Sequence, residues 1–339
     1  MCPRALHRLS PLNEHVVIDR RRSLLAPPRR FFAAWGQFWL APMRASTYVL
    51  MRSALALTVI VWLVMVLSDL FAFYSESGVR PNPVYSDYRY GLFQWFQSDT
   101  AIVVVLVMTL VAACAVLSGN LVRLFGPLMW LGMMSFQLDN LSVLNAGDEL
   151  LRVWCAYFAI FAVVTPNSAS SISVRDLYRP NRDEALAPVW LLRMAQIQIT
   201  LIYPASVIAK LDGGTWQDGT AALYALQVRD FQRLWVPESL TDNLAVGRVL
   251  TYLTLAIEIA VPVLLWIPRT RRFAIVVGMG MHLGFDYAMR LGFFVWSMAI
   301  GYCAFLTPRE ADWILRKLPW IEPALELEQP DPVAPMATM

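Results

Sequence analysis

The feature that most constrains this chain is a series of long apolar stretches that contain almost no charged residues. Residues 100–118, for example, include no charged side chain. Such a stretch approaches the roughly 20 residues that a helix needs to cross the hydrocarbon core of a bilayer. Hydrophobic residues make up 58% of the chain and charged residues 16%, against about 45–50% and about 25% in an ordinary soluble domain. The sequence therefore predicts an all-α, polytopic bundle of transmembrane helices.

About eight membrane spans are predicted from the apolar stretches and the polar segments between them. The predicted spans are 46–72, 100–118, 122–139, 148–165, 188–210, 245–267, 273–290 and 292–307. The last two spans are separated by Leu291 alone, so the turn between them is the least defined feature of the pattern.

The two ends of the chain differ from this membrane region. Residues 1–30 are rich in arginine and proline and are predicted to form a disordered tail, and residues 319–339 are predicted to form a second one. Residues 31–318 then form one transmembrane domain. It begins with the segment "FFAAWGQFWLAP" (31–42), in which Phe31, Trp35, Phe38 and Trp39 share one helical face. This pattern is typical of a helix that lies in the membrane interface.

The distribution of arginine predicts the orientation of the spans, because cytoplasmic loops carry an excess of basic residues. Most of the cations lie in four segments: the region before Thr47, 175–184, 268–272 and 308–317. With eight spans, both termini are then cytoplasmic. Lys210 lies at the opposite, extracytoplasmic end of the fifth span.

Composition also excludes several kinds of partner. The chain has 28 basic and 25 acidic residues, a net charge of +3, and its arginines lie in loops between apolar spans, which argues against nucleic-acid binding. Cys2 lies in the tail, and Cys114, Cys155 and Cys303 lie in apolar stretches without a CxxC motif. Neither a disulfide framework nor a metal site is expected.

The fifth span carries a polar stripe. Gln196, Ile199, Tyr203, Ser206 and Lys210 follow a spacing of three, four, three and four residues, which places them on one helical face. A polar stripe that faced lipid would leave its groups without hydrogen-bond partners. The stripe is therefore expected to face the interior of the bundle.

Lys210 is unusual because lysine is rare in this sequence. It and Lys317 are the only lysines among the 28 basic residues. One interpretation is that the side chain extends to the membrane interface, as lysines at helix ends often do. The other is that a lysine is needed, because a desolvated lysine can lose its proton and act as a base whereas arginine stays charged.

Two further spans carry ionisable residues, and the spacing places them at one depth in the membrane. His282 and Asp286 lie four residues apart in the seventh span, so Asp286 is placed to accept a hydrogen bond from the imidazole. Glu258 lies as far from the connecting turn in the sixth span as His282 does in the seventh. Glu258 and His282 are therefore expected to meet, either in a site or as a structural pair that joins two helices.

The polar residues near the start of the fourth span have a structural explanation. In "NAGDELLR" (145–152), Asn145 is placed as a helix N-cap with Asp148 three residues later, and Asp148 and Arg152 are four residues apart. Helix capping accounts for these three residues without a chemical role.

Three segments together resemble the HTTM domain, the membrane region shared by vitamin K-dependent gamma-carboxylase and many bacterial proteins. They are "LLRMAQIQITLIYPASVIAKLDGGTWQDG", "MHLGFDYAMRLGFF" and "SFQLDNLSVLNAGDELLR". The resemblance covers roughly residues 40–318. Its most specific part is a signature in the fifth span, formed by Arg193, Gln196, Lys210, Leu211, Asp212, Trp216 and Gly219.

The resemblance implies a function and a location. The lysine matching Lys210 is regarded as the base that deprotonates vitamin K hydroquinone, so the resemblance implies a reduced quinone of the vitamin K or menaquinone type as cofactor. It implies a catalytic role for Lys210 and His282, in a multi-pass protein of the bacterial inner membrane. Residues expected to bind substrate or shape the site are Gln196, Tyr203, Asp212, Trp216, Glu258 and Asp286.

This sequence departs from the carboxylase in ways that limit the expected chemistry. It has no histidine in the segment before the fourth span, where the carboxylase has one, and no counterpart of the carboxylase's large lumenal region is expected. Deprotonation of a quinol is compatible with these differences, whereas repeated carboxylation of protein glutamates is not expected. The alternative function is a non-catalytic membrane protein that assists the maturation or tolerance of an exported protein. Beyond lipid, the expected partners are therefore a membrane quinol or an exported protein.

Overall fold

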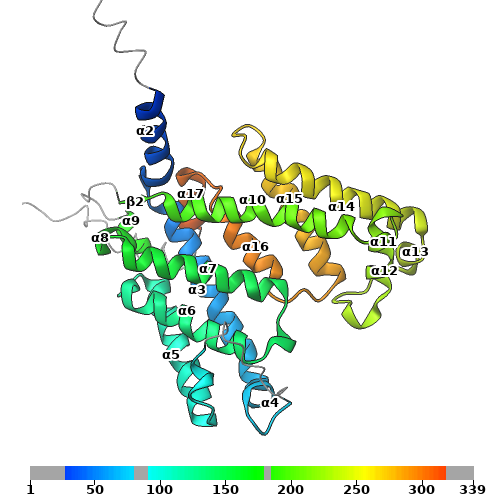
Figure 1. Ribbon diagram of the computed structural model, residues 1–339, viewed down its shortest axis with the longest axis horizontal. Coiled ribbons are helices and arrows are strands. Elements are labelled where there is room, and N and C mark those ends of the chain that lie inside the picture. The colour runs from blue at the N-terminus through cyan, green and yellow to red at the C-terminus, as the bar shows by residue number, and fades with distance from the viewer. Residues whose placement is uncertain (1–26, 80–90, 179–184, 318–339) are drawn as a thin grey trace, which may run out of the picture.

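The computed structural model describes residues 27–79, 91–178 and 185–317. Almost all of the predicted tails, 1–30 and 319–339, lies outside these ranges. The described part of the chain is mostly helical, and its helices form one bundle (Figure 1).

Each predicted span has a helical counterpart. These helices are α3 (Ser46–Val66), α5 (Asp99–Ser118), α6 (Val122–Asp139), α7 (Ala146–Val164), α10 (Trp190–Leu211), α14 (Leu244–Leu264), α15 (Arg271–Ala288) and α16 (Phe294–Cys303). Among the residues described, four helical stretches are long and apolar enough to cross a membrane: Ser46–Tyr74, Asp99–Ser118, Trp190–Leu211 and Leu244–Leu264. The count of about eight spans and the cytoplasmic placement of both termini stay predictions.

The last predicted span is shorter in the structure than the sequence pattern suggested. α16 has 10 residues, which correspond to about 15 Å of helix, whereas the hydrocarbon core is about 30 Å thick. The predicted span 292–307 was too long because Gly292 adopts a left-handed φ of 58° before the helix, and Thr307 begins the next helix with its own capping box. A hydropathy pattern does not predict the turn at Gly292 or the new helix start at Thr307.

The connecting segments contain short elements. These are η1 (Leu67–Asp69), α4 (Leu70–Tyr74), η2 (Leu92–Gln94), η3 (Leu141–Val143), α8 (Asn167–Ser170), α9 (Val174–Tyr178), α11 (Gly214–Gln217), α12 (Ala221–Gln227), η4 (Arg229–Phe231) and α13 (Glu238–Thr241). Two helices flank the bundle, α2 (Pro27–Leu40) and α17 (Pro308–Arg316). The helix α2 begins at Pro27, inside the predicted tail, because proline is favoured in the first helical turn.

The fold also contains a small β-sheet, which the all-α prediction did not include. The strands β1 (Pro42–Arg44) and β2 (Leu186–Pro188) pair antiparallel, with Met43 opposite Ala187. Each strand immediately precedes a long helix, α3 or α10, and each contains a proline that disfavours helix at the preceding residue. The extended entries to the two helices lie side by side, so their backbone groups bond to each other.

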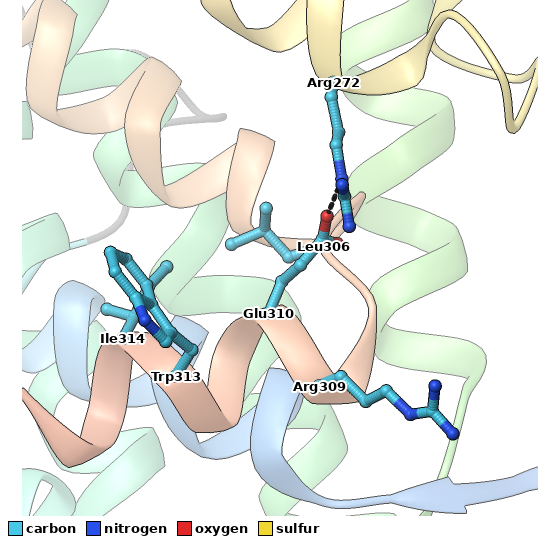
Figure 2. Close-up of a pocket in the computed structure, with 6 residues that line it drawn as sticks. All are labelled: Arg272, Leu306, Arg309, Glu310, Trp313 and Ile314. Atoms are coloured by element: carbon cyan, nitrogen blue, oxygen red, sulfur yellow. Dashed lines mark hydrogen bonds and ion pairs between the residues drawn. The ribbon is translucent and has the colours of Figure 1, made fainter.

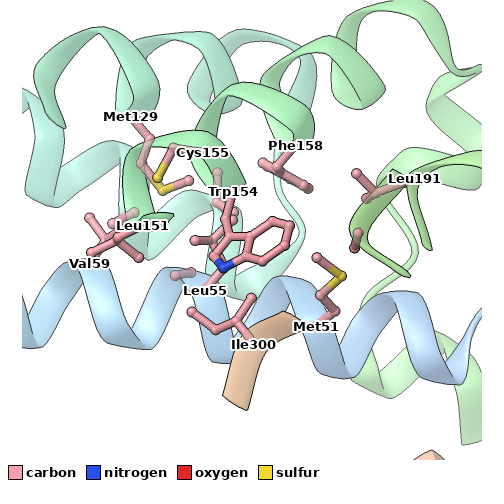
Figure 3. Packing of buried hydrophobic residues seen from close by; sticks show 14 of the residues in the cluster. Met51, Leu55, Val59, Met129, Leu151, Trp154, Cys155, Phe158, Leu191 and Ile300 are labelled. Atoms are coloured by element: carbon pink, nitrogen blue, oxygen red, sulfur yellow. The ribbon is translucent and has the colours of Figure 1, made fainter. Parts of the chain in front are cut away.

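One half of the bundle, which we call the core half, consists of α3, α5, α6 and α7. Its centre is Trp154, which is fully buried and donates a hydrogen bond from Nε1 to the carbonyl oxygen of Ser297 at 2.8 Å. Figure 3 shows its ring surrounded by side chains from several helices, including Leu55 of α3, Phe158 of α7 and Ile300 of α16. Close packing of large side chains therefore holds this half together.

The other half, which we call the site half, consists of α10, α14 and α15. The helices α14 and α15 pack against each other as the predicted hairpin, and α10 packs against α14 (Figure 1). The helix α16 contacts α3 and α7 as well as α10 and α15, so it joins the two halves. The short helices α12 and α13 pack against α14 at the end of the bundle where Lys210 lies.

The opposite end of the bundle, which we call the arginine-rich end, contains the sheet, α9, α17 and the α14–α15 turn. Here Arg44 forms an ion pair with Asp312 at 3.0 Å, and Arg272 pairs with Glu310. These contacts attach α17 to the entry of α3 and to the start of α15.

Candidate active site

The site is built on one face of α10. The side chains of Ile199 and Tyr203 are buried, with exposed fractions of 0% and 1%, and Ser206 and Lys210 continue the same face toward the helix end. The stripe faces α14, α15 and α16, as its amphipathic spacing predicted. Polar groups on this face therefore have partners from neighbouring helices instead of facing lipid.

Lys210 forms the central contact of the site. Its Nζ lies 2.5 Å from Oε1 and 2.7 Å from Oε2 of Glu258, and it donates a hydrogen bond to Oγ of Ser206 at 2.6 Å. Glu258 comes from the middle of α14, and its side chain is 5% exposed, against 19% for that of Lys210. The two opposite charges neutralise each other in an apolar setting, where a lone charge would be costly.

The segment that follows α10 covers the amine. Nζ of Lys210 lies 5.1 Å from the ring centroid of Trp216 in α11, within the range of a cation–π interaction. Asp212, two residues after Lys210, is exposed at the end of α10. The structure therefore brings Trp216 to the site and leaves Asp212 outside it.

A second set of polar contacts lies about two helical turns deeper, around Tyr203. Its hydroxyl lies 2.9 Å from Nε2 of His282 and forms a hydrogen bond with the hydroxyl of Tyr302. A Cβ atom at Gly278, one turn before His282 on α15, would collide with the Tyr302 hydroxyl. Because residue 278 is glycine, α15 approaches α16 closely enough for the three side chains to meet.

Two pairings expected around His282 differ in the structure. Asp286 does not accept a hydrogen bond from the imidazole; its Oδ1 forms an ion pair at 3.0 Å with Arg233, which lies after η4. Glu258 pairs with Lys210 and not with His282. Spacing along each helix determined which residues share a face, but the rotation of the helices about their axes determined which faces meet.

His282 itself is buried, with an exposed fraction of 3%. Its Nε2 contacts Tyr203, whereas Nδ1 has no hydrogen-bond partner within the part of the chain that the structure describes. The ring also lies edge-on to Phe294, with centroids 5.3 Å apart. One polar atom of the imidazole is thus left free in an apolar surrounding.

Gln196 and Arg193 lie at the other end of α10. Gln196 is 14 residues from Lys210, which corresponds to about 21 Å along the helix. It donates a hydrogen bond from Nε2 to the carbonyl of Ala304 at 2.7 Å, and Arg193 contacts both Gln196 and Phe38. The expected site-shaping role of Gln196 therefore does not extend to the surroundings of Lys210; both residues join α10 to its neighbours.

The structural role expected for Asn145 and Asp148 matches their contacts. Together they form a capping box at the start of α7, and Oδ1 of Asp148 also accepts a hydrogen bond from Nε1 of Trp62 at 3.0 Å. Arg152 donates to Oε1 of Gln137 at 3.3 Å. These contacts hold the start of α7 against α3 and α6.

Comparison with known proteins identifies the family. The sequence model of the HTTM domain matches residues 41–313 of this chain, which include every residue of the site. The chain belongs to the HTTM-domain family. Searches of curated proteins and of solved structures returned no match.

The HTTM domain and its apolar helices make this chain an integral membrane protein of the carboxylase-related family. The outward faces of the apolar helices contact lipid. Residues such as Leu57, Val104 and Ile259 lie on these faces and are exposed by 46%, 59% and 59%. Extended apolar surfaces of this kind mark contact with a partner or a membrane.

Two contributors to the site of this HTTM-domain protein were not predicted from the sequence. Tyr302 lies in the apolar stretch "SMAIGYCAF", where no charge or spacing distinguishes it, and Arg233 lies in a polar loop. Only the glycine at 278, one turn from His282, signals a close approach between helices. The presence of this glycine does not predict that Tyr302 is the residue that faces it, or that a hydroxyl group lies there.

The arrangement offers groups that can exchange protons. Within the described ranges, no group of three or more His, Cys, Asp or Glu side chains could hold a metal ion. The available chemistry is that of an amine, a carboxylate and a hydroxyl in direct contact, with an imidazole and two phenols nearby. Such a set can transfer protons and hold a partly polar ligand.

Proposed function

We propose that this HTTM-domain protein acts on a reduced membrane quinone, with Lys210 as the base that deprotonates it at the extracytoplasmic face. The observation that carries this proposal is the contact of Nζ of Lys210 with Glu258 and Ser206 near the end of an apolar helix. A quinol has two hydroxyl groups on an apolar ring, which suits a partly desolvated amine at the edge of a bilayer. The resemblance of the Lys210 segment to the carboxylase supports the same assignment.

The Lys210–Glu258 contact suggests how the amine becomes available. Transfer of one proton from Nζ to the Glu258 carboxylate leaves a neutral amine beside a neutral carboxylic acid, so the site as a whole keeps the same charge. The neutral amine then removes a proton from a quinol hydroxyl: the N–H bond forms, the O–H bond breaks, and its electron pair stays on the quinol oxygen. The new ammonium lies next to the quinolate and stabilises it.

The deeper residues are assigned a supporting role in this proposal. His282, held by Tyr203, would form the floor of the site together with Phe294. Trp216 would cover the amine on the other side. This combination of aromatic walls and few polar groups is typical of sites that bind small, partly apolar ligands.

Oxygen uptake by the purified protein in lipid, supplied with reduced menaquinone or a reduced vitamin K analogue, tests the proposal. Deprotonated quinols react with oxygen, so wild type is expected to consume oxygen. In Lys210→Ala and Lys210→Arg the rate of uptake is expected to fall by at least about 100-fold, as when other general bases are removed. Lys317→Ala, which removes the only other lysine, is the matched control. Uptake retained by Lys210→Ala, or none by wild type with any of these quinols, contradicts the proposal.

The second candidate is a non-catalytic protein that assists an exported protein. It is favoured by the segment between α12 and α13 (228–237), in which Phe231 and Trp235 are 62% and 72% exposed. Exposed aromatic side chains of this kind are typical of surfaces that bind a protein partner. The ion pair between Arg233 and Asp286 and the bond from the Leu234 N–H to the Tyr287 carbonyl hold this segment against α15. Unchanged cellular function in both Lys210 variants would favour this candidate.

The proposed location is the bacterial inner membrane, with eight spans and both termini in the cytoplasm. The excess of arginine at the arginine-rich end supports this orientation. Single-cysteine labelling from the two sides of sealed vesicles tests it. A cysteine introduced at Thr215 should react from the extracytoplasmic side and one at Arg175 from the cytoplasmic side; the reverse result overturns the orientation.

A further inference from the structure

A pocket of about 370 Å³ lies at the arginine-rich end of the bundle, opposite to the end where Lys210 lies. Figure 2 shows Arg272 reaching from α15 toward Glu310 on α17, with Trp313 along the same helix. The residues that line the pocket are Arg272, Leu306, Arg309, Glu310, Trp313 and Ile314. None of these residues takes part in the proposed quinol chemistry.

The pocket combines charged and apolar walls. Arg309 has no hydrogen-bond or ion-pair partner among residues 27–79, 91–178 and 185–317, and Arg272 is 80% exposed at its side chain although it pairs with Glu310. Glu310 is satisfied separately, since the backbone N–H and the hydroxyl of Thr307 both donate to it. The pocket therefore presents guanidinium donors that can still bind an anion.

The helix that begins beside the pocket adds to the positive potential. The first turn of α15 contains Arg271 and Arg272 and no acidic residue, and its N-cap residue, Thr270, makes no side-chain capping bond. The N-terminus of a helix carries a partial positive charge, so it repels the arginines there. A bound anion would be attracted both to this partial charge and to the arginines. The region thus favours a negatively charged ligand, although the arginines also serve as orientation signals.

The apolar residues indicate what else the ligand contains. Trp313 is 66% exposed on the same face of α17 as Arg309, four residues earlier, whereas Ala311 and Leu315 are fully buried on the opposite face. A helix with one buried face and an arginine–tryptophan face is typical of the membrane interface. An acyl chain can follow the apolar wall of Leu306 and Ile314 while a phosphate meets the arginines.

We propose that this pocket binds the headgroup of an anionic phospholipid of the cytoplasmic leaflet. The phosphate would accept hydrogen bonds from the guanidinium of Arg309, which points away from Arg272 in the structure (Figure 2). Arg272 would add positive charge, and Trp313 would lie at the level of the headgroups. The site connects the α14–α15 turn to α17, so a bound lipid would hold these two elements together. It is independent of whether Lys210 acts as a base.

Lipid binding by the full chain in nanodiscs tests this proposal. Native mass spectrometry would count retained lipids in discs of phosphatidylcholine with a minor fraction of phosphatidylglycerol. Wild type is expected to retain phosphatidylglycerol, and Arg309→Gln is expected to weaken this retention about tenfold, since it removes a charge-assisted hydrogen bond. Arg272→Gln provides a second variant at the pocket. Arg175→Gln, an exposed arginine of α9 at the same end, removes the same charge outside the pocket and should retain the lipid as wild type does.

Three outcomes would overturn the proposal. The first is equal retention of phosphatidylcholine and phosphatidylglycerol by wild type. The second is an equal loss in Arg175→Gln, which would indicate a general attraction of the positive surface and no specific pocket. The third is displacement of the lipid by inorganic phosphate at millimolar concentration, which would identify the site as one for a soluble anion.

Discussion

The core half and the site half of the bundle are stabilised in different ways. Along α7 the buried residues include large side chains, such as Trp154 and Phe158, that fill the space between helices. Along α15 the buried residues other than His282 are small, such as Ala274 and Gly278. Small residues let helix backbones approach closely and bring hydroxyl and imidazole groups together. Large side chains therefore fill the centre of the first half, where Gly132 and Gly126 also let α6 pack closely against α5 and α7. Along α15 in the second half, small residues and polar contacts predominate.

The two halves also use their buried acidic residues differently. Asp148 in the core half is bound by its own capping box and by Trp62, so local helix geometry explains its presence. Glu258 in the site half lies in the interior of a helix and is paired with the lysine of another. A buried ion pair of this kind often adds little net stability. The small net stabilisation expected of this pair is compatible with the chemical role proposed for it.

The largest effect is expected from truncation in the core half. Trp154→Ala should lower the free energy of unfolding by about 3–5 kcal/mol, because it leaves a cavity that neighbouring helices cannot fill. Denaturant titration of the protein in mixed micelles measures the change. Trp235→Ala, at a residue that is 72% exposed, is the control and should change stability by less than about 1 kcal/mol. Equal losses would contradict the assignment of Trp154 as the centre of packing in the core half.

The next largest effect is expected from breaking the ion pair in the site half. Lys210→Met should destabilise the fold by about 3 kcal/mol, because it leaves the Glu258 carboxylate buried without its counter-charge. The double substitution Lys210→Met/Glu258→Leu should recover most of this loss. A double-mutant cycle on unfolding free energies measures the coupling. Additive effects of the two substitutions would contradict the contact.

A smaller effect is expected at the helix caps, one in each half. Asn145→Ala should cost about 1–2 kcal/mol, since it removes the capping box of α7. Asn243→Ala, which removes the exposed cap of α14, should cost about 0.5–1 kcal/mol. The difference is expected because Asn145 also packs against Gly292. Thermal unfolding of the two variants compares them, and a larger loss for Asn243→Ala would reverse the ranking.

The smallest effect is expected at the arginine-rich end and depends on pH. Burial raises the pKa of Glu310, but hydrogen bonds from the Thr307 backbone and hydroxyl and the contact with Arg272 outweigh it, so the pKa lies below its ordinary value. A carboxyl with a lowered folded-state pKa stabilises the fold above the pKa of the unfolded chain and loses this contribution as pH falls through the folded-state value. The expected loss is less than about 1 kcal/mol, because solvent screens this contact. Unfolding measured between pH 7 and pH 3 should show this component in wild type and not in Glu310→Gln.

The features that depend on neighbouring residues along one helix could be predicted from the sequence. Apolar stretches predicted the helices, a repeat of three and four residues placed Tyr203 and Lys210 on one buried face, and "NAGD" predicted the cap of α7. Each of these follows from the periodicity and local hydrogen bonding of a helix. The HTTM resemblance was likewise contained in contiguous motifs, and the family match confirmed it.

Which helices face each other, and at what depth, depends on packing between helices and could not be predicted from the sequence. Glu258 and His282 were expected to meet, but Glu258 pairs with Lys210 and His282 contacts Tyr203, which in turn meets Tyr302. A rotation of one helix by a single residue position turns its side chains by about 100°, and nothing within that helix specifies this rotation. It is determined by the fit of side chains and small residues across the interface, such as the approach of α15 to α16 at Gly278.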